Sequence, residues 1–159
     1  MQIVILAVGK LKERYWREAF AEYAKRLSGY VNLSVVEVAD EPAPDHVSPM
    51  EIGYILKTEA HRLERHLKPR DGIVILDRQG RQYASEDWSQ QFTRLEAEAF
   101  GRLVFIIGGS YGLDESIQKQ ASLKWSFGPL TLPHQLARIV LAEQIYRGIR
   151  IARGEPYHK

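Results

Sequence analysis

Residues 103–150 have the sequence LVFIIGGSYGLDESIQKQASLKWSFGPLTLPHQLARIVLAEQIYRGIR, and this stretch carries most of the information about the fold. Two apolar, strand-forming runs, 103–107 and 123–127, each lead into a Gly-containing segment and then into a helix, of which the second reaches about Arg150. Ligands of open α/β sheets bind outside the carboxyl ends of the strands, so a pocket is expected here. Ordinary strand-to-helix turns have the same composition, and both interpretations stay open. The glycines that could approach a ligand closely are Gly108, Gly109, Gly112 and Gly128.

The bulk composition is that of a globular protein. The chain has 159 residues, of which 45% are hydrophobic and 26% charged, and we expect one domain over residues 1–159. No apolar run approaches the roughly 20 residues that span a bilayer. The start, MQIVILAVGK, indicates a strand rather than a signal peptide. There is no cysteine, which excludes disulfides and thiolate metal sites. We therefore expect a cytoplasmic protein with no membrane partner.

Positive charge is concentrated near both ends of the chain. Residues 10–26 contain six basic and three acidic side chains, and residues 134–159 contain five and two. Residues 27–133 contain eleven basic and fifteen acidic side chains, although the net charge of the whole chain is only +2. If the fold brings the two ends together, they form a surface suited to a polyanion. The alternative is a pair of solvated helix faces.

Hydrophobic periodicity predicts strands and helices in alternation. We expect strands at residues 3–8, 31–38, 73–76, 103–107 and 123–127. We expect helices at residues 10–27, from a capping box at Ser48 to Leu67, from a cap at Ser85 to Gly101, shortly after Gly112, and up to Arg150. A polar loop is expected at residues 77–83. Five alternations predict an α/β fold with a mostly parallel sheet and helices on both faces.

The common sequence motifs of metal, nucleotide and hydrolase sites are absent from this sequence. His61 and His66 are five residues apart, so they do not share a helix face as metal-binding i, i+4 pairs do, and we expect no metal. There is no P-loop and no G-x-S-x-G elbow, and GGSYG differs from the dinucleotide fingerprint G-x-G-x-x-G. The remaining possibility is a pocket without phosphate-binding groups, formed by residues 76–80, 108–112 and 127–132. Apolar side chains beside glycine backbone favour an adenosyl ligand.

The last helix combines polar and apolar features. His134 and Arg138 are i, i+4 neighbours at its start. The helix has apolar residues on more than one side, which predicts a homodimer built partly on it. A charged residue at Ile145 or Tyr146 is accordingly expected to give monomers, and Gly108→Val is expected to block the pocket without unfolding the protein.

Three segments together, FIIGGSYGL, LTLPHQLARIVLAEQIYR and the terminal PYHK, resemble the small bacterial ribosomal RNA methyltransferases of the SPOUT superfamily, which act on N3 of a pseudouridine in large-subunit RNA. The resemblance covers essentially the whole chain. It implies an α/β fold with a carboxyl-terminal trefoil knot, a homodimer, and S-adenosyl-L-methionine as methyl donor without a metal. The implied partner is the RNA of the large ribosomal subunit or of the 70S ribosome.

The resemblance also implies functional residues, carried over position by position. The candidate cofactor-binding residues are Leu76, Gly108, Gly109, Gly112, Phe127, Gly128, Pro129, Leu130, Thr131 and Leu132. The candidate catalytic residues are His134, Arg138, Tyr157 and His158. Of these, Arg138 is expected to anchor phosphate or base, and the other three to orient substrate or transfer a proton. Residues 127–129 differ from those of some relatives, so backbone rather than side-chain contacts are expected there.

Two other functions fit the same residues. One is a non-catalytic, ribosome-associated RNA-binding factor that uses the basic ends and no cofactor. The other is a SPOUT methyltransferase that acts on transfer RNA. Binding of S-adenosyl-L-methionine separates the first from an enzyme, and the identity of the methylated RNA separates the second.

Overall fold

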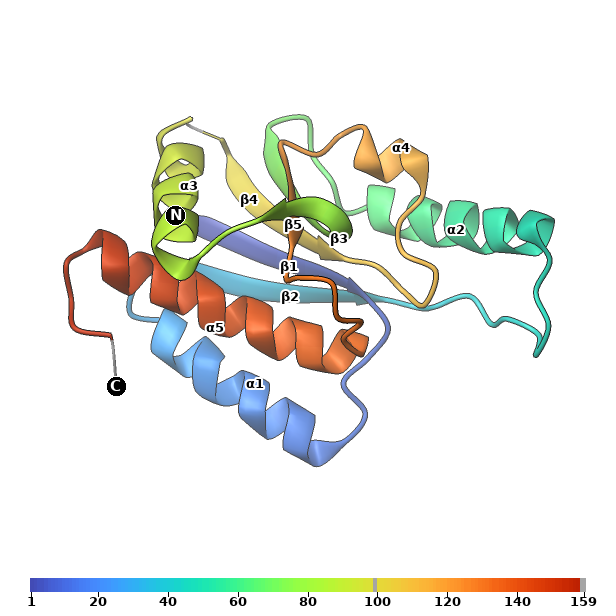
Figure 1. Ribbon diagram of the computed structural model, residues 1–159, viewed down its shortest axis with the longest axis horizontal. Coiled ribbons are helices and arrows are strands. Elements are labelled where there is room, and N and C mark those ends of the chain that lie inside the picture. Colours follow the sequence, from blue (N-terminus) through green and yellow to red (C-terminus); the bar gives the residue numbers. More distant parts are fainter. Residues whose placement is uncertain (99, 158–159) are drawn as a thin grey trace.

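The computed structural model describes residues 1–98 and 100–157, which form a five-stranded sheet with helices on both faces (Figure 1). All strand pairs are parallel, and the strand order is β2-β1-β4-β3-β5. The strands are β1 (Gln2–Val8), β2 (Asn32–Val38), β3 (Asp71–Gln82), β4 (Arg102–Ile107) and β5 (Leu123–Ser126). The predicted α/β class and parallel sheet are confirmed. Because every strand runs the same way, all carboxyl ends lie at one edge of the sheet.

The helices form a layer on each face of the sheet. The helices are α1 (Arg14–Leu27), α2 (Pro49–Glu64), α3 (Ser85–Ala97), α4 (Glu115–Gln118) and α5 (His134–Ala152). Buried side chains of α1, α3 and α5 share one core, whereas those of α2 and α4 belong to the other. Along β1, Ile3, Ile5 and Ala7 enter the first core and Val4, Leu6 and Val8 the second, which is the period of two expected for a strand.

The predicted polar loop at residues 77–83 is wrong. Strand β3 continues to Gln82, although its pairing with β5 shifts register between Leu76 and Arg81, both of which lie opposite Trp125. A strand needs only backbone hydrogen bonds to continue, so polar side chains do not end it. The shift marks an irregularity at the carboxyl edge of the sheet, next to the other loops.

One of the two predicted amino-terminal helix caps, that of α2, is present, and the other, at α3, is not. The capping box of Ser48 and Glu51 is present at α2. Ser85 does not cap α3: it is the first helical residue, and its hydroxyl donates to Gln144 Oε1 at 2.9 Å. The helix also ends at Ala97, before Gly101. Ser85 therefore connects α3 to α5, and no such long-range contact is readable from local sequence.

A stack of aromatic rings fixes α3, α5 and β5 relative to one another. Trp88 of α3 is fully buried and stacks on Trp125 of β5, with ring centroids 3.7 Å apart and planes at 19°. Its indole Nε1 donates to the carbonyl of Gln144 in α5 at 3.0 Å. Through Trp88, the position of β5 is thus fixed relative to α5.

None of the helices within the described residues has the length and apolarity that crossing a membrane requires.

Candidate active site

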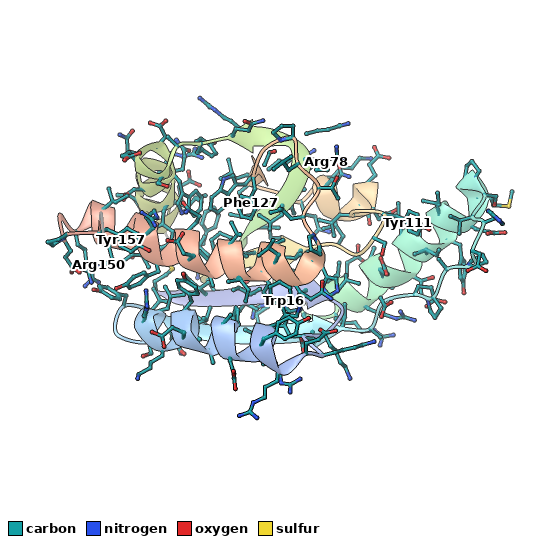
Figure 2. All side chains as sticks on the ribbon, turned by 60° about the horizontal axis from the view of Figure 1, so that its bottom comes forward. Trp16, Arg78, Tyr111, Phe127, Arg150 and Tyr157 are labelled. Atoms are coloured by element: carbon teal, nitrogen blue, oxygen red, sulfur yellow. The ribbon has the colours of Figure 1, made fainter. Side chains whose placement is uncertain are left out.

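A cleft of about 1100 Å³ lies at the carboxyl edge of the sheet. Its walls come from the irregular part of β3, where the register shifts, from the segments that follow β4 and β5, and from the first turn of α5. The lining residues are 75–79, 107–113 and 127–134, with Gln118, Trp125 and Ala137. Figure 2 labels one side chain from each segment: Arg78, Tyr111 and Phe127.

All ten residues predicted to bind a cofactor lie on this one cleft. They are Leu76, Gly108, Gly109, Gly112, Phe127, Gly128, Pro129, Leu130, Thr131 and Leu132. The segments are separated by up to about 50 positions in the sequence, and the parallel sheet brings them together because their strands end at the same edge. Asp77, Arg78 and Gln79 also line the cleft, as expected for the predicted pocket segment 76–80. Sequence reasoning missed Ile75, Ile107, Leu113, Gln118, Trp125, Pro133 and Ala137, which complete the lining.

The glycines serve different geometric needs. Gly112 and Gly128 have positive φ angles of 86° and 111°, which side chains disfavour. The NH of Gly128 donates to Ser126 Oγ at 3.1 Å, which fixes that turn. Gly108 is needed for another reason: a Cβ there would lie 2.6 Å from the carbonyl oxygen of Gly112. The expectation that Gly108→Val acts by filling ligand space is therefore wrong, because it would first displace the turn itself.

His134 connects the cleft to the end of β1. Its imidazole lies against Gly9, where a Cβ would come 3.0 Å from Cε1 and where φ is +96°. The Nδ1 atom is buried and has no hydrogen-bond partner within residues 1–98 and 100–157. Burial, followed by the nearby charge of Arg138, lowers the pKa of His134 from its ordinary 6.5. The imidazole is therefore neutral at physiological pH.

Arg138 lies in the interior, one turn beyond His134. Its side chain is 2% exposed, its Nη1 pairs with Glu37 Oε2 at 2.5 Å, and its Nη2 donates to the carbonyl of Gly9 at 3.1 Å. Glu37 Oε2 also accepts from the NH of Leu11 at 3.3 Å. This placement corrects the expectation that Arg138 anchors RNA: both of its Nη atoms are engaged inside the protomer. Instead, it fixes the backbone against which His134 packs.

Tyr157 follows α5 in the sequence and packs back against that helix, away from the cleft. Its hydroxyl donates to Glu143 Oε1 at 2.5 Å, and the guanidinium of Arg147 lies 3.8 Å from its ring centroid. Burial and the bond to Glu143 raise its pKa to about 12, so the phenol stays protonated and acts as a donor rather than a base. Figure 2 shows Tyr157 beside Arg150, at the opposite end of α5 from its amino-terminal turn. The fourth candidate, His158, lies outside the described residues.

The segment before Tyr157 is also held in place. Arg150 pairs with Glu155 at 2.8 Å and donates to the carbonyl of Pro156 at 2.7 Å. The hydroxyl of Tyr30, which precedes β2, donates to Glu155 at 2.7 Å. These contacts tie residues 155–157 to α5 and to the start of β2. The described part of the tail is therefore packed rather than frayed, unlike a typical terminus.

Glu59 of α2 is a buried carboxyl beneath the cleft. It is 4% exposed, and a Cβ at Gly109 would lie 3.1 Å from its Oε1. Oε2 accepts from the NH of Glu41 at 3.0 Å, whereas Oε1 has no partner among the residues that the structure describes. Burial, and to a lesser extent the charge of Asp40, raises the pKa of Glu59 above its ordinary 4.5. Glu59 thus explains why Gly109 has no side chain.

Glu59→Gln is expected to gain stability relative to the native protein as pH rises. A carboxyl with a raised pKa in the folded state favours folding below its unfolded pKa, and that contribution is lost as pH rises through the folded pKa. Glutamine at position 59 keeps an oxygen that can accept a hydrogen bond from the NH of Glu41. Because it does not titrate, its contribution to stability does not fall as pH rises. Urea denaturation from acidic to neutral pH measures the difference. Glu64→Gln, the same change at an exposed position of α2, is the control. A pH-independent difference for Glu59→Gln would contradict the prediction.

The arrangement suits a mid-sized organic ligand. The volume lies slightly above the range of about 300–1,000 Å³ typical of ligand pockets, and the lining combines aliphatic side chains with glycine backbone. Within the described residues, no three His, Cys, Asp or Glu side chains are grouped so as to hold a metal ion. A neutral histidine at the rim adds a group that can accept a proton.

Comparison with known proteins agrees with this geometry. The family model described as "Predicted SPOUT methyltransferase" matches residues 1–158. A protein of Streptococcus suis (strain 05ZYH33) named ribosomal RNA large subunit methyltransferase H is 47% identical over 159 residues, with both chains covered completely. Proteins of the same name from Carboxydothermus hydrogenoformans and Desulfitobacterium hafniense (strain DSM 10664 / DCB-2) are 46% and 44% identical over all of this chain and 100% and 99% of their own. The resemblance seen in the sequence is confirmed, and the chain belongs to the SPOUT methyltransferase family.

Proposed function

We propose that the protein transfers a methyl group from S-adenosyl-L-methionine to N3 of a pseudouridine in 23S ribosomal RNA. Two findings support the proposal: membership of the SPOUT methyltransferase family, and relatives that are named for methylation of large-subunit ribosomal RNA. The observation that carries most weight is the convergence of three segments, from the irregular part of β3 and from the ends of β4 and β5, on one cleft of about 1100 Å³. The proposed substrate places the protein's action in the cytoplasm.

The cleft fits the proposed cofactor in size and in chemistry. The backbone of residues 108–112 and 127–132 would supply hydrogen-bonding groups, and Leu76 and Leu132 would supply apolar contact. When bound, the cofactor supplies a methyl group activated by its sulfonium centre. Phe127, which packs edge-on against Trp125 with centroids 4.9 Å apart, provides a rigid wall. A rigid wall favours a defined orientation of the ligand, which is a principal source of catalysis in transfer reactions.

His134 is the residue that we assign to the proton of the target imide. Methylation of N3 requires loss of the N3 proton, and a neutral imidazole can accept it. The lowered pKa of His134 keeps the ring neutral, and its packing on Gly9 restricts its orientation. Arg138 and Glu37 act indirectly, by fixing the carbonyl of Gly9 and the NH of Leu11. They are positioning residues in this proposal.

The predicted homodimer explains how the tail could reach an active site. Tyr157 and the cleft lie at different ends of α5, so one protomer does not bring them together. We propose that a second copy does, and that Tyr157 and His158 contact RNA there. The trefoil knot implied by the resemblance stays a prediction. So does the choice between the large subunit and the 70S ribosome as partner.

Ile139→Asp is expected to give a monomer. Ile145 and Tyr146 are unsuitable positions for this test, because their side chains are 0% and 9% exposed in the protomer's own core and a charge there would first disturb that core. Ile139 is half-buried in α5, so part of its side chain is available to a partner. A charge there would face the partner and weaken the dimer by several kcal/mol, on the order of an unpaired buried charge. Sedimentation at micromolar concentration measures the mass.

Val35→Asp is the matched control for Ile139→Asp. Val35 is a partly exposed apolar residue on β2, at the far edge of the sheet, and its replacement should leave the dimer intact. If the native protein sediments only as an 18.3 kDa species, the dimer proposal fails.

Titration with S-adenosyl-L-methionine tests the enzymatic proposal against the RNA-binding alternative. Calorimetry should give saturable binding to the native protein in the absence of RNA. A non-catalytic ribosomal factor has no reason to bind this compound, so an absence of heat at millimolar cofactor would favour it.

A further inference from the structure

The segment after β1 combines exposed positive charge with aromatic rings. Residues 10–17 have the sequence KLKERYWR, and Lys10, Lys12, Arg14 and Arg17 are all exposed. We call these four cations, together with Tyr15 and Trp16, the first-helix patch. Glu13 is the one acidic residue among them. This density of cations beside aromatic rings is typical of surfaces that bind single-stranded nucleic acid.

The first-helix patch adjoins the cleft. It begins one residue after Gly9, which packs on His134 of the cleft lining. Figure 1 shows α1 and α5 side by side, with both helices beginning on the side of the molecule where β1 ends. Arg138 of α5 holds the carbonyl of Gly9 at 3.1 Å, so the two helix starts are tied together. RNA lying on this patch would therefore pass the rim of the cleft.

The loop that carries Lys10 and Lys12 is held in a fixed shape. Arg17 donates through Nη1 to the carbonyls of Leu11 and Lys12. The NH of Leu11 donates to Glu37 at 3.3 Å. Both lysines thus extend into solvent from an ordered backbone. Such preorganisation reduces the entropy lost when they bind a ligand.

The ring of Tyr15 has no role in the core. It is 63% exposed, and it leans on the half-buried Trp16 with ring centroids 5.2 Å apart and planes at 56°. Trp16 therefore supports a tyrosine whose ring is largely open to solvent. An open aromatic face can stack on a base, but only where that base is unpaired.

The acidic residues near the first-helix patch do not neutralise its positive charge. Arg14 pairs with Glu18 at 2.7 Å, but both side chains are highly exposed, and such pairs contribute little free energy. A phosphate can therefore compete for Arg14. Glu37 is already engaged by Arg138. The surface available to a ligand keeps its positive character.

We propose that the first-helix patch binds the single-stranded RNA that flanks the target nucleotide, with Lys10, Lys12 and Arg14 on phosphates and Tyr15 stacked on a base. This inference rests on the proposed function, and it names the part of the protein that holds the substrate beside the cleft.

The test compares two variants with the native protein. The first is Lys10→Gln/Lys12→Gln/Arg14→Gln, and the second is Tyr15→Ala. The probe is a fluorescent single-stranded RNA of about 12 nucleotides containing one pseudouridine, a length that a single binding groove can cover. Removing three phosphate contacts should weaken binding by more than about tenfold and reduce the slope of log affinity against log salt by about 2. Tyr15→Ala should weaken binding by about tenfold and leave the salt slope unchanged.

The control is Arg65→Gln/Lys68→Gln, which removes exposed cations near the start of β3, at the amino-terminal edge of the sheet. It should bind the RNA like the native protein. Equal loss in the control and the triple variant would overturn the proposal, because the effect would then be one of net charge. Native-like binding by Tyr15→Ala, or equal affinity for a duplex probe, would overturn the single-strand assignment. Failure of the native protein to bind S-adenosyl-L-methionine would instead refute the proposed function, and cofactor titration of every variant keeps the two outcomes separate.

Discussion

Ala137→Trp is expected to lower the affinity for S-adenosyl-L-methionine by at least about a hundredfold in a protein that still folds. Ala137 lies in the first turn of α5, is half-buried, and lines the cleft. Its backbone NH already bonds to the carbonyl of Pro133 at 3.0 Å, so the helix does not depend on the side chain. An indole at this position would occupy the space that a ligand needs. Calorimetry with the cofactor measures the loss.

Gln135→Trp is the matched control for this substitution. Gln135 is in the same helical turn, is also half-buried, and does not line the cleft. Its replacement should leave the affinity within about threefold, a difference below 1 kcal/mol. Unchanged cofactor affinity in a folded Ala137→Trp protein would mean that the ligand binds elsewhere.

His134→Asn is expected to lower the methyl-transfer rate by about 10²- to 10⁴-fold, the usual contribution of a positioned acid or base. Asparagine retains hydrogen-bonding groups and has no titratable nitrogen. Because the pKa of His134 is lowered, the native rate should be constant near neutrality and fall only below the ordinary histidine range, where the imidazole becomes protonated. The variant should lack this acidic decline.

Single-turnover rates at a series of pH values decide this prediction. His61→Asn, which changes an exposed histidine of α2, is the control and should keep the native profile. A variant at position 134 with a native rate and a native acidic decline would show that another group, or solvent, takes the proton.

Most of the architecture could be predicted because it depends on local patterns. Continuous apolar runs and their alternation with helices define a parallel sheet, and the strand-end glycines mark the edge where a cleft forms. The residues that line the cleft were therefore largely predictable as a group. The extension of β3 to Gln82 was not, since polar residues pair through backbone alone when β5 lies beside them.

Buried charges were the features that sequence reasoning missed or placed wrongly. Glu59 lies between Ile55 and Leu63 at i, i+4 spacing, so it occupies a core-facing position of α2. Arg138 likewise precedes Leu141 on the buried side of α5. A charged residue on an apolar face was the available signal, but its partners are distant in sequence, 101 positions away for Glu37.

The apolar character of α5 had two possible explanations, and sequence alone did not separate them. Ile145 and Tyr146 belong to the core because α5 packs against the sheet between α1 and α3. A helix with neighbours on three sides needs apolar residues around most of its circumference. Tertiary packing, not a partner subunit, therefore accounts for these two positions.

Mass spectrometry of ribosomal RNA tests the central proposal most directly. Purified protein is incubated with S-adenosyl-L-methionine bearing a deuterated methyl group and with ribosomes that lack the modification, and nuclease fragments of all RNAs are then analysed. The proposal predicts one labelled methyl group on N3 of a pseudouridine in 23S RNA, and none with Ala137→Trp. Label confined to transfer RNA, or an absence of label in 23S RNA despite cofactor binding, would contradict it.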